Sequence, residues 1–116
     1  SIEEVTNLSV TITTTGRPVF LAIICDGIGP LFTNIRTFSP SPTAASQIYF
    51  IRNDVAIAAY TTGIVATGAT FVDSWGPGTL FHIDTPPAGT YTYKVAVSVF
   101  SGTIDVVAYR LIAFEL

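Results

Sequence analysis

Apolar and polar residues alternate near the start of the chain and then give way to a continuous apolar run. Residues 7–15 read NLSVTITTT, in which leucine, valine and isoleucine alternate with serine and threonine. A period of two residues is typical of a β-strand with one buried and one solvated face. Residues 19–25, VFLAIIC, have lost this alternation, which indicates a strand that is covered on both faces. Gly16, between the two segments, predicts a turn.

Further strands are predicted in the second half of the chain. Residues 47–53 and 55–65 are rich in β-branched and aromatic residues and flank Asp54, which favours a hairpin with a tight polar turn. Tyrosine and valine then alternate with polar residues in a long strand, and Ser101-Gly102 turns the chain into a last strand. These later strands are predicted at residues 79–83, 90–100 and 103–116.

Two segments show neither the period of two residues of a β-strand nor the period of 3.6 residues of an α-helix. Residues 28–42 contain three prolines, and residues 66–78 contain several glycines and the single tryptophan, so both are interpreted as long connections. No apolar stripe of period 3.6 is sustained over ten residues. The pattern therefore predicts an all-β fold, an antiparallel, jelly-roll-like β-sandwich of seven or eight strands, formed by residues 1–116 as a single domain.

The last predicted strand is apolar on both faces, whereas one face of an antiparallel sandwich normally meets water. Either a long loop or another subunit must then cover it, and we expect a subunit, because the strand stays apolar to Leu116. The residues expected at this subunit interface are Val107, Tyr109, Leu111, Phe114 and Leu116.

Composition narrows the classes of function. Hydrophobic residues make up 49% of the 116 residues and charged residues 11%, with a net charge of −3, which excludes the composition of a disordered chain and the basic face of a nucleic-acid binder. No apolar stretch approaches the length that a membrane-spanning helix needs, so we expect no membrane insertion. One cysteine and one histidine form neither an intrachain disulfide nor a zinc site, and we expect no cofactor.

Three segments resemble a known kind of module. They are residues 10–19 (VTITTTGRPV), residues 82–95 (HIDTPPAGTYTYKV) and residues 110–116 (RLIAFEL). They are similar to the small β-sandwich modules at the carboxy-terminal ends of phage tail fibres and in related phage surface proteins. The order of strand, turn and final strand is also similar, in architecture, to the trimeric jelly rolls of the complement and tumour-necrosis-factor type.

The resemblance implies a homotrimeric component at the surface of a virion, assembled with other virion proteins. Its function would be that of a fibre tip that contacts a glycan or protein of the host surface through loops on a rigid sandwich. The alternative is a trimeric decoration protein that clamps and stabilises the phage head. The matching segments are strands and turns, so the resemblance carries no catalytic residues.

Few residues suggest a catalytic or metal-binding site. His82 and Asp84 lie two apart on a predicted strand and face the same way, and Ser74 is the serine that would complete a hydrolase set. No nucleophile-elbow motif supports this hypothesis, and we interpret the pair as a polar strand end with local hydrogen bonds, in a protein that is not an enzyme. Cys25 is expected to be buried and inert. An oxygen-ligand calcium site could be built from two of the loops that hold Asp26, Asp54, Asp73 and Asp84.

The best candidate for recognition is the predicted loop with Asp73, Ser74 and Trp75. Exposed aromatic residues in loops stack on sugars or enter partner pockets. The alternative is that Trp75 caps one end of the sandwich core.

Overall fold

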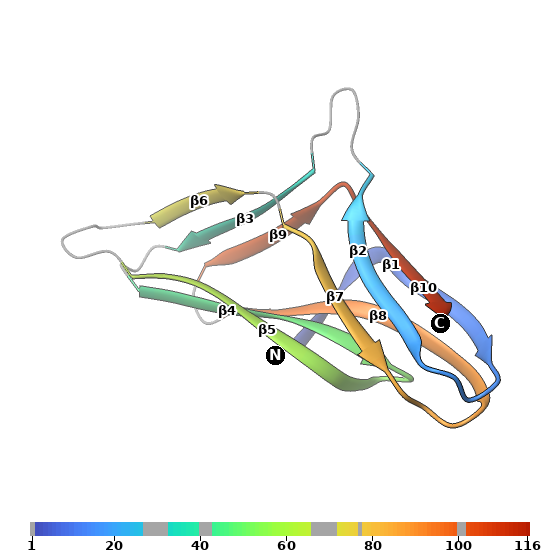
Figure 1. Cartoon of the computed structure of the whole chain (residues 1–116). Coiled ribbons are helices and arrows are strands. Elements are labelled where there is room, and N and C mark those ends of the chain that lie inside the picture. The colour runs from blue at the N-terminus through green and yellow to red at the C-terminus, as the bar shows by residue number, and fades with distance from the viewer. Residues whose placement is uncertain (1, 27–32, 40–42, 66–71, 77, 100–101) are drawn as a thin grey trace.

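The computed structural model describes residues 2–26, 33–39, 43–65, 72–76, 78–99 and 102–116, which form antiparallel sheets without a helix (Figure 1). The largest sheet has the strand order β1-β8-β4-β5. Its members are β1 (Ile2–Thr14), β8 (Gly89–Val99), β4 (Thr43–Arg52) and β5 (Val55–Val65). No helix long and apolar enough to cross a bilayer occurs in these described ranges.

Two three-stranded sheets follow one another end to end as a second layer. One has the order β10-β2-β7 and the other the order β6-β3-β9. Their strands are β2 (Val19–Cys25), β3 (Asn34–Ser39), β6 (Val72–Gly76), β7 (Leu80–Asp84), β9 (Thr103–Val107) and β10 (Tyr109–Glu115). Cys25 pairs with Tyr109 and Asn34 pairs with Val107, so β2 and β3 continue one another beside β10 and β9. The second layer thus has three strand positions, and each is divided once, into β2 and β3, β10 and β9, and β7 and β6.

The core lies between the two layers. The four-stranded sheet and the second layer both contribute to one cluster of buried side chains, which is the arrangement of a β-sandwich. Its members are Leu8, Ile48, Phe50, Tyr93 and Val95 from the first layer and Val19, Leu21, Ile23, Ile104, Tyr109 and Leu111 from the second. The antiparallel β-sandwich predicted from the alternation is confirmed. The described residues form ten strands instead of seven or eight, because β3 and β6 lie in segments that were predicted as connections and the last predicted strand is divided into β9 and β10.

Side chains close both sides of the sandwich at the β10-β2-β7 end. On one side, Tyr60 of β5 donates a hydrogen bond to the backbone carbonyl of Phe81 in β7. On the other, the backbone N–H of Thr15 donates to Glu115 of β10, and the Thr15 hydroxyl donates to the same carboxylate at 2.8 Å. These contacts hold the two layers together where their edge strands are not hydrogen-bonded to each other.

The predicted hairpin is confirmed at residues 52–55. Arg52 pairs with Val55, and the two residues between them, Asn53 and Asp54, have φ of 46° and 67°. Positive φ at both central residues matches the type I′ turn that suits twisted hairpins, and asparagine and aspartate tolerate it. The Asn53 side chain also accepts a hydrogen bond from the backbone N–H of Thr92 at 2.9 Å, which fixes the turn against β8.

Both segments that were predicted as irregular contain a strand. β3 lies within residues 28–42 and is the central strand of its sheet. Its inward-facing position Thr37 is buried, so the buried face of β3 includes a polar residue and shows no apolar alternation. β6 lies within residues 66–78 and pairs with β3. The prediction of long connections was therefore wrong at these strands.

Ala108 separates β9 from β10 and changes which side chains face the core. It has a φ of 58°, and Asp26 N–H and the Thr33 hydroxyl both donate to its carbonyl at 2.9 Å. The even-numbered Ile104 is buried before this residue, whereas the odd-numbered Tyr109 is buried after it. An irregular residue of this kind acts as a bulge and reverses the alternation. Figure 1 shows the bend between β9 and β10.

Candidate functional site

The outer face of the β10-β2-β7 sheet is apolar and exposed. Along β2 the odd-numbered residues Val19, Leu21 and Ile23 are fully buried, so the even-numbered residues point away from the core. Phe20 lies at the centre of this outer face and pairs with Phe114 of β10 on one side and Ile83 of β7 on the other.

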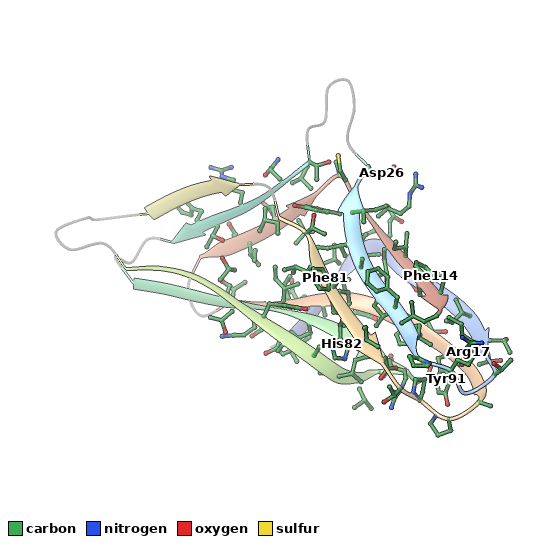
Figure 2. All side chains as sticks on the ribbon, viewed as in Figure 1. Arg17, Asp26, Phe81, His82, Tyr91 and Phe114 are labelled. Carbon is green, nitrogen blue, oxygen red and sulfur yellow. The ribbon has the colours of Figure 1, made fainter. Side chains whose placement is uncertain are left out.

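Three phenylalanines form a ridge across the three strands. The ring centroids of Phe20 and Phe114 are 5.3 Å apart, and those of Phe20 and Phe81 are 6.2 Å apart. Both are within the usual range for contacting aromatic pairs. Phe81 and Phe114 are nevertheless 59% and 48% exposed, and Figure 2 labels them on the strands that flank β2. We call this ridge with its aliphatic neighbours the phenylalanine face; its members are Phe20, Phe81, Ile83, Ile112, Phe114 and Leu116.

The structure divides the expected interface residues between two environments. Phe114 and Leu116 are both 48% exposed and belong to the phenylalanine face. Tyr109 and Leu111 are buried in the chain's own core, so they pack within the single chain and are not part of the phenylalanine face; their place at a subunit interface stays a prediction. Val107 is partly buried in β9, before the bulge at Ala108. The last strand is apolar on both faces in part because this bulge reverses its alternation, a cause that the sequence pattern did not reveal.

Residues of β2 and β7 were missing from the expected interface. Phe20 was assigned to a strand covered on both faces, yet on the outer face of β2 Phe20 and Ile24 are only partly buried, and Ala22 alone is buried. Phe81 and Ile83 alternate with His82 and Asp84 along β7. This alternation was the available signal, because it places two large apolar residues opposite two polar ones. It was ambiguous, since the polar pair is the one that faces the core.

The loop expected for recognition is a strand in part. Asp73, Ser74 and Trp75 have backbone positions within β6 and pair with Phe38, Thr37 and Arg36 of β3. Their placement in a loop was therefore wrong, because the segment pairs with a strand that was itself not predicted. Their side chains lie outside the described part of the structure, and so does the question of whether Trp75 caps the core.

His82 and Asp84 do face the same way, toward the space between the layers. The Asp84 carboxylate accepts two hydrogen bonds from Arg52 at 2.8 Å and one from the Tyr93 hydroxyl at 2.7 Å. Burial, followed by the bond to Asp84, raises the pKa of Tyr93. The bond to Asp84 likewise raises the pKa of Arg52. These contacts tie the end of β7 to β4 and β8, which agrees with the interpretation of a polar strand end with local hydrogen bonds.

The hydrolase set of His82, Asp84 and Ser74, which the sequence did not favour, is not assembled. The ring of His82 stacks on Phe50, with the centroids 6.5 Å apart, and Figure 2 labels His82 on β7. The backbone of Ser74 lies in β6, in the other sheet of the second layer and toward the opposite end of the molecule in Figure 1. Nothing in the described geometry gives His82 a nucleophile to activate.

The aspartates of the proposed calcium site are dispersed. Asp26 pairs with Arg110 at 2.7 Å, and Asp84 pairs with Arg52. Asp54 lies 3.8 Å from Lys94. No group of three or more potential metal ligands occurs among the described residues. Asp73 lies outside this statement, because its side chain is not described.

Cys25 is exposed, whereas the sequence predicted it to be buried. It is the last residue of β2, at the point where the second layer is interrupted, so the core ends beneath it. Its sulfur lies 3.0 Å from the hydroxyl oxygen of Thr33. Thr33 and Cys25 also line a hollow of about 400 Å³ with Gly78, Thr79 and Tyr109.

Comparisons with protein-family models, with curated proteins and with solved structures found no match to this chain.

Proposed function

We propose that the chain is a non-enzymatic structural and binding module of a phage particle, namely the trimeric tip domain of a tail fibre that contacts the host surface. The phage assignment rests on the resemblance of residues 10–19, 82–95 and 110–116 to fibre-end modules. The assembly rests on the phenylalanine face. A face that leaves Phe81 and Phe114 about half exposed on either side of a partly buried Phe20 favours a partner over a free monomer.

The contrast with the other outer face of the sandwich supports this proposal. On the four-stranded sheet, Thr11 and Thr92 are hydrogen-bonded through their hydroxyls at 2.9 Å, and Thr13 and Thr90 at 3.0 Å. Hydroxyl groups suit a face that meets water. The same fold thus has one face suited to solvent and one suited to protein contact, and the second is where we place the neighbouring subunits.

The proposal is tested in two stages. Light scattering of the purified chain at micromolar concentration is expected to give three times the 12.3 kDa mass of the chain. Gold-labelled antibodies on intact particles are expected to mark the ends of the tail fibres. A monomer in solution contradicts the assembly, and labelling of the head favours the alternative, a decoration protein that stabilises the capsid.

A binding assay tests the contact with the host. The purified trimer is expected to compete with the particle for adsorption to host cells, because both present the same surface. Chain denatured by heat provides the control. A trimer located on fibre ends that does not reduce adsorption at any concentration contradicts the role of a receptor-binding tip and leaves a structural one.

A further inference from the structure

A groove lies between the first half of β1 and β9, away from the end at which side chains close the sandwich. Two adjoining hollows of about 320 and 360 Å³ form it. We call it the edge groove. Its principal lining residues are Glu3 of β1, Val97 and Val99 of β8, and Ile104, Asp105 and Val106 of β9.

The floor of the edge groove is core surface that the described residues cover only in part. On β8, the fully buried Val95 is followed on the same face by Val97 and Val99, which are only partly buried. On β9, Ile104 belongs to the core cluster, and Val106 packs against this cluster while remaining partly buried. Apolar side chains of an added segment would therefore extend the existing core.

Two strand edges border the edge groove. β1 is an outermost strand of the four-stranded sheet, and β9 is an outermost strand of the β6-β3-β9 sheet. In the sheets that the structure describes, the outward edge of neither strand has a ladder partner. The N–H and C=O groups of such an edge are a template for pairing with a further strand.

The charges at the edge groove are of one sign. Glu3, Glu4 and Asp105 are acidic, and none of the described lining residues is basic. Lys94 binds Glu4 at 2.8 Å, whereas Glu3 and Asp105 have no ion pair among the described residues. A positively charged partner is therefore complementary to this site. A second copy of the chain, with its net charge of −3, is not.

We infer that the edge groove binds an extended segment of another protein, which pairs with β9 and alternates apolar with basic side chains. The apolar side chains enter the groove toward Val97 and Val106. Successive side chains of a strand point to opposite faces, so the basic ones lie beside Asp105, which points away from the core, and Glu3 adds negative charge from the opposite wall. Backbone pairing gives affinity in this mode of binding, and alternate side chains give selectivity.

The inference goes beyond the proposed function, because it applies to a free chain as well as to a trimer. It specifies the kind of segment that a neighbouring protein of the particle presents to this chain. The assembly and the groove can therefore fail independently of each other.

A synthetic hexapeptide of sequence KVKVKV, acetylated and amidated at its ends, is the probe. Its binding is followed through the amide chemical shifts of the nitrogen-15-labelled chain. We expect the shifts to change along β9 and the first half of β1, and to stay constant along β5. Absence of binding, or changes confined to other strands, overturns the inference.

Two peptides of the same length provide the controls. EVEVEV keeps the alternation but reverses the charge, and we expect it to bind about tenfold more weakly. KVKPKV keeps the positive charge, but its proline lacks a backbone donor and disfavours a paired strand, so its affinity should fall by a similar factor. Equal binding of EVEVEV overturns the preference for basic segments, and equal binding of KVKPKV shows attraction of charge without strand pairing.

A pair of matched variants locates the charge that is recognised. Asp105→Asn and Asp54→Asn each neutralise one exposed aspartate, the first beside the edge groove and the second in the hairpin turn of the other layer. Asp105→Asn should weaken the binding of KVKVKV about threefold, and the difference should shrink at high salt. Asp54→Asn should leave the affinity unchanged. Equal losses in the two variants contradict recognition at the groove.

These outcomes are separate from those of the proposed function. A monomeric chain that binds KVKVKV along β9 upholds the inference and contradicts the proposed trimer. A trimer that does not bind the peptide overturns the inference and leaves the trimer standing. Cooperative unfolding of each variant, followed by circular dichroism, shows that it is folded.

Discussion

The two outer faces of the sandwich are built from the same kind of strand and differ in what they present. The outer face of β1 and β8 carries paired threonines, Thr11 with Thr92 and Thr13 with Thr90. The outer face of β10, β2 and β7 carries the phenylalanine ridge. A β-sandwich needs apolar residues only between its sheets. The ridge is therefore not required by the fold, and this is the reason for assigning function to that side of the molecule.

The largest expected effect on the free energy of unfolding is for a substitution in the core, compared with one on the phenylalanine face. Leu21 is fully buried, and its neighbour Phe20 belongs to the outer face. Leu21→Ala should lower the free energy of unfolding by about 2–5 kcal/mol, because it removes buried surface and leaves a cavity. Phe81→Thr, on the outer face, should cost about 1 kcal/mol or less. Urea denaturation at a concentration low enough to keep the chain monomeric measures both.

Equal losses for the two variants would contradict the distinction between an inner and an outer face of β7 and β2. The low concentration matters, because association stabilises the folded chain by mass action. At high concentration Phe81→Thr should lose stability that it does not lose when dilute. That additional loss reports assembly and not folding.

A second prediction compares an ion pair between the layers with one on the threonine-bearing sheet. Asp84 is 7% exposed and bonded to Arg52 and Tyr93. Asp84→Asn removes the charge that both donors face, and should lower the free energy of unfolding by about 1–3 kcal/mol. Asp54→Asn is the matched control, since the side chain of Asp54 is 88% exposed and 3.8 Å from Lys94. Its expected cost is about 0–1 kcal/mol.

Thermal unfolding followed by circular dichroism provides the measurement. A variant Asp84→Asn as stable as Asp54→Asn would show that the contacts between β4, β7 and β8 do not hold the layers together. Tyr93→Phe, which removes only the hydroxyl, is expected to give an intermediate loss.

The third prediction concerns the bulge that decides which residues of β10 face outward. Ala108 has a positive φ of 58°, which is unfavourable for an alanine by roughly 1–2 kcal/mol, whereas glycine adopts it without steric cost. Ala108→Gly should therefore raise the free energy of unfolding, by about 0.5–1 kcal/mol after the greater flexibility of the unfolded glycine is subtracted. Chemical denaturation measures it. A loss of stability would mean that the alanine side chain contributes more by packing than it costs in strain.

These comparisons also show how far the sequence predicted the molecule. The alternation in residues 7–15 and 90–100 was sufficient to predict two strands with a polar outer face, because one face of each meets water. In the structure these two strands are neighbours. The hairpin at Asn53 and Asp54 was also predictable, because the residues that favour its turn are adjacent in the sequence. β3 and β6 were missed, because their pairing joins segments far apart in the chain and a buried threonine hides the pattern.

The candidate site could be predicted only in part. Phe114 and Leu116 were expected at an interface, because an apolar strand end has to be covered. Tyr109 and Leu111 were assigned there too, since a single strand does not reveal a bulge at Ala108. The ridge itself depends on register. Phe20 meets Phe114 and Phe81 only when three strands from different parts of the chain are aligned.

The smallest expected effect is at the edge where the threonine-bearing sheet meets the phenylalanine face. Hydrogen bonds from the backbone N–H and then the hydroxyl of Thr15 lower the pKa of Glu115. A carboxylate whose pKa is lower in the folded chain stabilises the folded state at pH values above the pKa of the unfolded state, and this stabilisation disappears as the pH falls through the pKa of the folded state.

Glu115→Gln should therefore lower the melting temperature slightly at pH 7, and the difference from the unmodified chain should vanish in acid. Thr15→Val keeps the backbone donor and should lose less. A difference that persists unchanged at acid pH would mean that Glu115 acts through packing instead of its charge, and the edge would then be held without the carboxylate.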